Sequence, residues 1–380
     1  TTTSSATTTS TTTTTTTTTA TPSASASSYP TCGQKVKNVP GDYSTIQEAV
    51  NMASAGDTIR VGAGTYTLSG SFNDGVNLKS GICFEGAGTN QTIITVPKRW
   101  GIYVANASYI IIKNLTVKNS GHLITSSFGG SDGGGIGIFY SNNIKIESCR
   151  LTGNRQNNGG GLGINSSQDI YVTSCLIDGN YAKNLGGGVS VGGSNVTFTN
   201  VTLADNSASY TGYGITQTVG GVYFVGGPFT IKNSILWNNS GVNVYGSPGA
   251  ASFTINYSDV GNWSGDIGNI SLDPKFVSAT DYSLQSTSPA INTGDPSILD
   301  SDGSRSDMGA YPFTGTTAPA DTTAPTISNV QAGSITQTTV SLNWTTKSKL
   351  PPYLSEISLI LSIEPLSSLI FCFSSSVKPS

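Results

Sequence analysis

The amino-acid sequence predicts an all-β protein, a right-handed parallel β-helix with an N-terminal capping helix. Similar segments recur along the middle of the chain at a fixed spacing, and each repeat holds three short runs of alternating apolar residues. The composition agrees with this prediction, because glycine is high at 46 residues and charged residues make up only 10%. Such a mixture suits turns and strands better than helices.

The repeat is the strongest of these observations. Matching segments begin at Ile146, Val172 and Phe198, a spacing of 26 residues, and related segments begin at Ile112 and Ile231. Self-similarity at such a period indicates a solenoid, in which each repeat stacks on its neighbours. We therefore expect Ile146, Val172 and Phe198 to lie directly above one another.

Each repeat also contains three apolar pairs with one residue between the members of a pair. Period-two alternation places both members on one face of a strand, so three inward-facing strands complete one triangular coil. The predicted inward pairs are Ile102/Val104, Ile110/Ile112, Leu115/Val117, Ile136/Ile138, Ile144/Ile146, Cys149/Leu151, Leu162/Ile164, Ile170/Val172, Cys175/Ile177, Val189/Val191, Val196/Phe198, Val201/Leu203, Val222/Phe224, Phe229/Ile231, Ser234/Leu236, Val242/Val244, Phe253/Ile255 and Ser258/Val260.

Polar residues and glycines separate these runs at equivalent places. Asparagine tolerates the left-handed turn conformation, and stacked amides or hydroxyls form ladders between coils. Gly133–Gly135, Gly159–Gly161 and Gly186–Gly188 precede the first runs and allow tight bends. The polar turn positions are Asn114, Ser148, Ser174, Asn200 and Asn233 before the third run, and Ser120, Asn154, Asn180, Asn206 and Asn239 after it.

Residues 43–53 predict one short amphipathic helix. Ser44 is the expected N-cap, with Gln47 three residues later as in a capping box. Ile46, Ala49 and Val50 share one face of this helix. It would cover the open end of the first coil, where apolar side chains and free strand edges would otherwise face water.

Two sets of motifs resemble known β-helix proteins. Tyr43–Val50 (YSTIQEAV), Ala55–Val61 (AGDTIRV) and Gly64–Tyr66 (GTY) are similar to the start of pectate-lyase-like proteins. Ser288–Asp295 (SPAINTGD) and Asp307–Tyr311 (DMGAY) are similar to the end of bacterial surface β-helix repeat proteins. The resemblance implies the fold and an extracellular or cell-surface location. It implies no single activity, because the superfamily includes lyases, hydrolases, epimerases and non-catalytic adhesins.

The chain divides into five predicted segments. Residues 1–30 are a Thr/Ser-rich disordered linker or stalk, and residues 36–313 are the β-helix. Residues 314–323 are a second linker. Residues 324–346 resemble the start of a fibronectin type III domain, although the chain is too short to complete one. The tail, 347–380, receives no assignment.

Charge and composition exclude several classes of protein. The net charge is −3 without a cluster of Lys or Arg, so nucleic acid is not an expected partner. The single histidine, His122, excludes a multi-histidine metal site. Glu364 and Pro365 interrupt the apolar run 357–373, so no membrane span is expected. The chain begins at Thr1 without a signal peptide, which indicates a mature product or a fragment.

Candidate catalytic residues lie in the loops of most variable length, which are 120–132, 155–158, 181–185 and 207–219. A polysaccharide lyase needs a base and cations that stabilise the anion beside a uronate carboxylate. Arg155 and Lys183 occupy equivalent loops of adjacent coils, and His122, Tyr181 or Lys183 is the candidate base. The alternative is that these are solvated turn residues. Paired aspartates with a Gly-His-Gly motif, as in galacturonases, are absent.

The same loops hold candidate carbohydrate-binding residues, which are Tyr181, Tyr210, Tyr213 and Gln156. Tyrosine offers a flat apolar ring with a polar end, which suits stacking on sugars. The alternative is a set of isolated surface side chains.

Asp300, Asp302 and Asp307 form an acidic loop with the character of a calcium site. The loop departs from the EF-hand pattern, because glycine follows the second aspartate and no bidentate glutamate comes at the required distance. Calcium is therefore a possible cofactor, and an ordinary Asp-rich turn is the alternative.

Four of the five cysteines have structural interpretations. Cys149 and Cys175 occupy equivalent positions in neighbouring coils, either as small buried side chains or as a disulfide. Cys32 and Cys83 could join the N-terminal cap to the first coils.

These features favour a secreted or cell-surface β-helix that binds polysaccharide or surface glycans, or acts as an adhesive or structural element. A polysaccharide lyase or glycoside hydrolase acting on acidic polysaccharide is the first alternative. The second is a fibre subunit that self-associates through its solenoid ends, because those ends are strand edges.

Overall fold

The computed structural model describes residues 28–68, 75–97, 100–121, 133–210, 217–246, 252–263 and 265–315, together with the backbone of 326–335, 339–347 and 359–362. The chain forms two units, Thr1–Thr314 and Gly315–Ser380, which we describe separately. His122, Tyr213 and most of the Thr/Ser-rich segment 1–30 lie outside the described residues.

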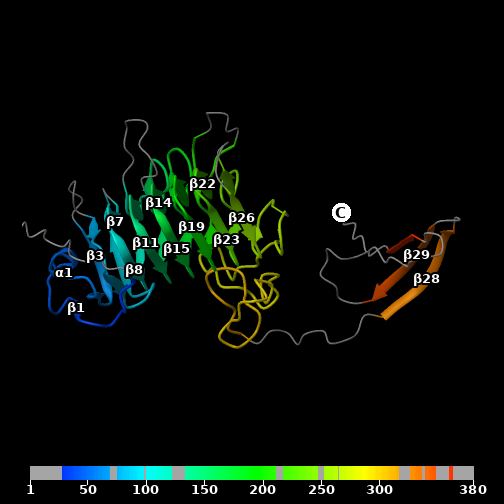
Figure 1. Ribbon diagram of the computed structural model, residues 1–380, viewed down its shortest axis with the longest axis horizontal. Coiled ribbons are helices and arrows are strands. Elements are labelled where there is room, and N and C mark those ends of the chain that lie inside the picture. Colours follow the sequence, from blue (N-terminus) through cyan, green and yellow to red (C-terminus); the bar gives the residue numbers. More distant parts are fainter. Residues whose placement is uncertain are drawn as a thin grey trace, which may run out of the picture. The chain divides into compact units, whose positions relative to one another are not determined.

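Three parallel sheets run along the first unit, and most coils contribute one strand to each sheet (Figure 1). The nine-stranded sheet consists of β1 (Val36–Val39), β2 (Thr58–Val61), β5 (Cys83–Gly86), β8 (Ser108–Lys113), β11 (Asn142–Glu147), β15 (Gln168–Thr173), β19 (Val196–Thr199), β23 (Phe229–Lys232) and β26 (Phe253–Asn256). The seven-stranded sheet consists of β4 (Val76–Leu78), β7 (Ile102–Ala105), β10 (Ile136–Phe139), β14 (Leu162–Asn165), β18 (Val189–Gly192), β22 (Val222–Val225) and β25 (Val244–Gly246).

The third sheet carries the clefts described below. This eight-stranded sheet consists of β3 (Gly64–Thr67), β6 (Thr92–Thr95), β9 (Thr116–Lys118), β12 (Arg150–Thr152), β16 (Leu176–Asp178), β20 (Thr202–Ala204), β24 (Ile235–Trp237) and β27 (Asp259–Val260). A short sheet follows it in three coils and consists of β13 (Arg155–Gln156), β17 (Tyr181–Ala182) and β21 (Ser207–Ala208). The all-β parallel solenoid predicted from the sequence is confirmed.

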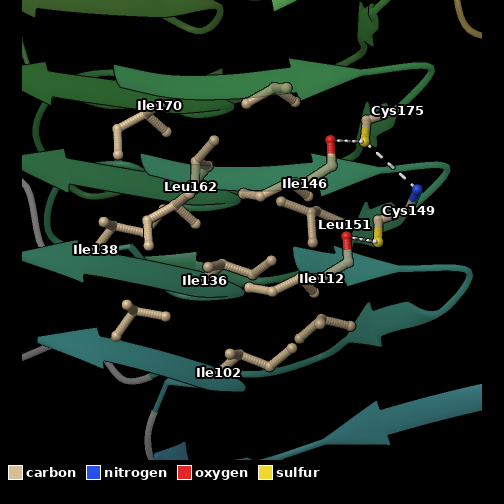
Figure 2. Packing of buried hydrophobic residues seen from close by; sticks show 14 of the residues in the cluster. Ile102, Ile112, Ile136, Ile138, Ile146, Cys149, Leu151, Leu162, Ile170 and Cys175 are labelled. Atoms are coloured by element: carbon tan, nitrogen blue, oxygen red, sulfur yellow. Dashed lines mark hydrogen bonds between the residues drawn. The ribbon is translucent and has the colours of Figure 1, made fainter. Parts of the chain in front are cut away.

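The register agrees with the predicted stacking. Ile146 pairs with Val172, and Val172 pairs with Phe198. All three side chains are buried, as are Ile112 and Leu151 beside them (Figure 2). Burying one side chain of this size contributes about 1.5–3 kcal/mol, and the stack repeats this gain in every coil.

One predicted inward pair, Val242/Val244, is wrong. Val244 pairs with Val222, so Gly246 and not Val242 completes the pair, opposite Phe224. Val242 instead packs outside the coil, against a small apolar cluster that contains Val219. The reason is the size of Phe224, because a Cβ on Gly246 would lie 2.5 Å from its ring.

The two equivalent cysteines are free thiols in the core. The backbone N–H of Cys149 donates to Cys175 Sγ (3.4 Å), and Cys175 Sγ donates to the carbonyl of Ile146 (3.5 Å; Figure 2). Burial raises the pKa of the Cys149 thiol well above its ordinary value. The prediction of small buried side chains is confirmed over the alternative disulfide.

A buried asparagine ladder joins the coils after each third strand. Asn154 Nδ2 donates to Asn180 Oδ1 (3.0 Å), and Asn180 Nδ2 donates to Asn206 Oδ1 (2.9 Å). Asn206 Nδ2 continues the ladder to Asn239 Oδ1 (2.9 Å). The five predicted positions before the third strand, among them Ser148, instead adopt positive φ.

The glycine triplets serve two purposes. Gly159 has a φ of +64°, in the left-handed region that glycine adopts without strain. A Cβ on Gly160 would lie 2.4 Å from the carbonyl oxygen of Tyr181, so this position requires glycine for space.

The first coil is closed by α1 (Ile46–Met52). Its N-cap is Thr45 and not Ser44 as predicted, since Thr45 Oγ1 accepts from the N–H of Glu48 (3.1 Å). Gln47 is unavailable for the capping box because its side chain exchanges two hydrogen bonds with the backbone of Asn77 at β4.

A disulfide joins Cys32 to Cys83 on β5. It ties the chain that precedes β1 to the coils, as the sequence suggested.

After the last coil the chain turns back along the solenoid. We call residues 265–315 the return segment. It packs on the outer face of the eight-stranded sheet, where Tyr282 contacts Leu176 and Met308 contacts Ile235. The N–H of Ala310 donates to Thr202 Oγ1 (2.9 Å), which fixes its register on β20.

The described part of the second unit consists of three antiparallel strands, β28 (Thr326–Ile335), β29 (Thr339–Lys347) and β30 (Leu359–Ser362). Its resemblance to a fibronectin type III domain stays a prediction. Among the described residues, no helix has the length and apolar character to cross a membrane.

Candidate functional site

The predicted cationic residues lie on neighbouring coils at the short sheet. Arg155 on β13 pairs with Tyr181 on β17, and the N–H of Lys183 donates to the carbonyl of Gln156 (2.9 Å). Lys183 follows the partner of Arg155 by two residues on the next coil. The two residues are therefore diagonal neighbours, with their backbones about 7–8 Å apart. Both side chains are exposed.

The predicted sugar-binding residues of this region differ in accessibility. Tyr181 is half-buried, and its hydroxyl lies 2.8 Å from Ser209 Oγ. Gln156 is buried, and its Oε1 accepts from the N–H of Asn157 (3.0 Å), so it does not face the surface. Tyr210 packs against the apolar cluster that contains Val219.

The acidic loop uses its carboxylates to hold backbone turns. Asp302 Oδ1 accepts from the N–H of Ser304 (2.9 Å), and Asp300 Oδ2 accepts from the N–H of Asp307 (2.9 Å). The Asp307 carboxylate accepts from the N–H groups of Asn292 and Phe313, both at 2.7 Å. Calcium binding at this loop stays a prediction.

Metal-ligating side chains cluster at a different place in the described structure. Within the described ranges, one group of three ligand-type side chains lies within 4.8 Å of one another, namely Cys32, Cys83 and Glu85. Both cysteines form the disulfide, so their sulfurs are not available as thiolates.

Two clefts lie between the eight-stranded sheet and the return segment. The first, which we call the Trp237 cleft, has a volume of about 440 Å³. The second, which we call the Arg150 cleft, has a volume of about 380 Å³. Tyr282 lines both. The Trp237 cleft is also lined by Asp205, Trp237, Asn238, Asp273, Lys275 and Gln285, and the Arg150 cleft by Thr89, Asn90, Arg150, Asp281, Ser283 and Tyr311.

Hydrogen bonds hold Asp205 in a fixed position in the Trp237 cleft. Its Oδ2 accepts from the Tyr282 hydroxyl (2.7 Å), and its Oδ1 accepts from Asn238 Nδ2. Burial and the hydrogen bond to Asp205 raise the pKa of Tyr282, so the hydroxyl remains a donor. Asp273 is exposed, and its Oδ1 accepts from the N–H of Lys275 (2.9 Å).

A bidentate ion pair is the main feature of the Arg150 cleft. Arg150 Nε and Nη2 donate to the two oxygens of Asp178 at 2.9 and 2.8 Å, and Thr152 Oγ1 donates to the same carboxylate (2.9 Å). The hydrogen bonds that Arg150 donates to Asp178 raise the pKa of Arg150. At the outer side of the cleft, hydrogen bonds from Ser283 lower the pKa of Asp281.

Comparison with known proteins identifies the fold. Residues 76–260 match the family model described as "Right handed beta helix region". This region is a right-handed parallel β-helix. The right-handed parallel β-helix predicted from the sequence is thus confirmed over these residues.

The solved structures similar to this β-helix are distant in sequence. Pectin methylesterase from carrot is 16% identical with a TM-score of 0.34, over 63% of this chain and 83% of that one. Pectate lyase Pel9A is 16% identical with a TM-score of 0.39, over 70% and 90%. Pectin methylesterase from Yersinia enterocolitica is 15% identical with a TM-score of 0.39, over 60% and 81%. No curated protein matches the chain.

The two clefts of this β-helix were not predicted, although one signal was present. Asp178, Ala204 and Trp237 are consecutive partners in register at an outward position of the eight-stranded sheet. The alternation of inward and outward residues places Trp237 on the outer face of its strand. A large aromatic side chain at such a position is the signal that could have indicated the cleft. The opposite walls come from residues 273–285, and nothing periodic links that stretch to the sheet.

Proposed function

We propose that this β-helix binds a polysaccharide chain in the Trp237 cleft. The observation that carries the proposal is an indole ring beside a carboxylate, an amide and an ammonium group in one cleft of about 440 Å³. Sugars present both apolar ring faces and hydroxyl groups. An aromatic ring with a few oriented polar groups is the arrangement that binds both features.

The fixed geometry of Asp205 supports this proposal. Tyr282 and Asn238 hold the two oxygens of its carboxylate before any ligand arrives. Each carboxylate oxygen has two lone pairs, so further hydroxyl donors can still bind. A preorganised acceptor loses little conformational entropy on binding, which favours affinity.

We further propose that the protein acts outside the cell. The Cys32–Cys83 disulfide supports this location, because such bonds persist in oxidising environments and are rare in the cytosol.

A polysaccharide lyase acting at Arg155 and Lys183 is the second candidate. Its support is the exposure of both cations on adjacent coils. A lyase acting on uronate polymers would produce unsaturated ends that absorb ultraviolet light, and Arg155→Ala would remove that absorbance. An unchanged rate in Arg155→Ala would exclude this site.

Affinity electrophoresis in gels with soluble polysaccharides tests the binding proposal. Trp237→Ala should weaken retention about tenfold, the effect of losing a central aromatic contact. Trp237→Phe keeps a flat ring and should retain most of the affinity. The matched control is Tyr181→Ala on the short sheet, which should bind as the unmodified protein does.

Two results would overturn the proposal. Loss of binding in Tyr181→Ala but not in Trp237→Ala would move the binding surface to the short sheet. Equal retention of a correctly folded Trp237→Ala, checked by its thermal unfolding, would remove the cleft from the function.

A further inference from the structure

We infer that the Trp237 and Arg150 clefts form one continuous site that selects neutral polysaccharides over polyuronates. This inference rests on the proposed function and specifies the substrate class of that site.

The two clefts are adjacent along the solenoid axis. Tyr282 is a wall of both. Arg150 on β12 pairs with Leu176 on β16, β16 pairs with β20 on the coil after that, and β20 pairs with β24, which carries Trp237. Neighbouring strands are about 4.8 Å apart, so Arg150 and Trp237 are separated by about 14 Å. The site therefore has the length of a short oligosaccharide that lies along the axis.

The charges of the combined site do not suit a polyanion. Asp205, Asp273 and Lys275 line the Trp237 cleft. Asp281 and Arg150 line the Arg150 cleft, and Arg150 is already paired with Asp178. Carboxylates thus outnumber cations by two. A uronate chain would bring further negative charge to these groups, and like charges repel most strongly where water is partly excluded.

The hydrogen-bonding capacity of the carboxylates in the two clefts favours the same substrate class, neutral polysaccharides. Ionised carboxylates only accept hydrogen bonds, and the hydroxyls of neutral sugars donate them. Uronate carboxylates also only accept, so they cannot donate to Asp205 or Asp281 as a hydroxyl of a neutral sugar in the same place would. Since hydrogen bonds from Ser283 lower the pKa of Asp281, its charge persists into mildly acidic solution. The indole of Trp237 supplies the apolar contact that an uncharged ring needs.

The experiment measures affinity for xylan, mixed-linkage glucan, mannan and polygalacturonate in parallel, at low salt and at about 0.3 M salt. At least one neutral polymer should bind at least tenfold more tightly than polygalacturonate at low salt. Salt should reduce this ratio, because it screens the repulsion.

Charge-removing variants sharpen the test. Asp273→Asn and Asp281→Asn should each raise the ratio of polygalacturonate affinity to neutral-polymer affinity severalfold. Asp266→Asn removes an exposed carboxylate of the return segment outside both clefts, so its ratio should stay unchanged.

The outcomes separate this inference from the proposed function. Tight binding of polygalacturonate that Trp237→Ala abolishes would overturn the selectivity and retain the binding site. Binding of neutral polymers that is insensitive to Trp237→Ala would overturn both. A shift of the ratio in Asp266→Asn as large as in Asp273→Asn would show that overall charge, not the clefts, decides the preference.

Discussion

The interior of the coils and the clefts beneath the return segment follow different rules. In the interior, Ile146, Val172 and Phe198 repeat one environment at each level, and the asparagine ladder repeats one set of hydrogen bonds. In the clefts no environment recurs, since Arg150, Ala204 and Trp237 occupy related outward positions but differ in size and charge. Stability thus comes from the periodic part of the molecule, and the candidate binding site from the part where periodicity ends.

The largest expected effect is on the periodic interior. Phe198→Ala removes a fully buried ring that contacts Phe229, so the free energy of unfolding should fall by about 3–5 kcal/mol. Urea denaturation followed by circular dichroism measures the change. Thr197→Ala on the outer face of the same strand is the control and should change stability by less than about 0.5 kcal/mol. Equal effects of the two variants would contradict the comparison.

A buried carboxylate lies where the coils meet the return segment. Asp259 on β27 accepts one hydrogen bond, from the N–H of Leu272 (3.1 Å), and its Oδ2 is buried without a partner in the described structure. Burial raises its pKa to about 7, and the charge of Asp273 adds to this effect. The folded state therefore holds the proton more tightly than the unfolded chain, and stability falls as pH rises from about 4 to about 7.

Asp259→Asn should remove that pH-dependent loss. The difference in the free energy of unfolding between the variant and the unmodified protein should be about 2–4 kcal/mol more favourable to the variant at pH 8 than at pH 4. Thermal and urea unfolding at both pH values measure the difference. Asp266→Asn, at an exposed position, should show no such dependence. If the effect of Asp259→Asn were the same at both pH values, the ionisation of Asp259 would not be its cause.

A substitution in the asparagine ladder is expected to lower the free energy of unfolding slightly less than the changes above. Asn180→Ala leaves the buried backbone N–H and the Nδ2 of Asn154 without their shared acceptor, and removes one of the two donors to Asn206 Oδ1, at a cost of about 2–3 kcal/mol. Asn180→Ser should lose less, because Ser120 occupies the equivalent position in an earlier coil and its Oγ accepts from the N–H of Val96 (2.9 Å). Urea denaturation compares the two. A loss below 0.5 kcal/mol in Asn180→Ala would show that water replaces the ladder.

The smallest effect on stability is expected at the clefts. Lys275→Asn should change the free energy of unfolding by less than about 0.5 kcal/mol, because the side chain is exposed and asparagine tolerates its positive φ. Polysaccharide affinity should fall about two- to tenfold through the lost hydrogen bond. Titration calorimetry and thermal unfolding of the same sample separate the two quantities. A large loss of stability would make Lys275 part of the scaffold.

The sequence predicted the coils but misplaced details that depend on neighbours. Val242 has the right polarity for an inward position, but the ring of Phe224 fills the space and Gly246 is needed there. Ser44 has the right chemistry for an N-cap, but Gln47 bonds to Asn77 and the cap moves to Thr45. The contacts that displace Val242 and occupy Gln47 come from other coils and have no local signature, whereas the cap itself, from the N–H of Glu48 to Thr45 Oγ1, is local.

By itself the sequence determined the inward pairs other than Val242/Val244, the turn residues and their 26-residue period, because alternation and spacing follow from backbone geometry alone. Only the tertiary structure decided that the return segment lies on the eight-stranded sheet and forms the two clefts. The physical reason is that Tyr282, Leu284 and Met308 bury apolar surface against a face that the repeat leaves aperiodic. Aperiodic side-chain packing becomes visible only when both surfaces are in place.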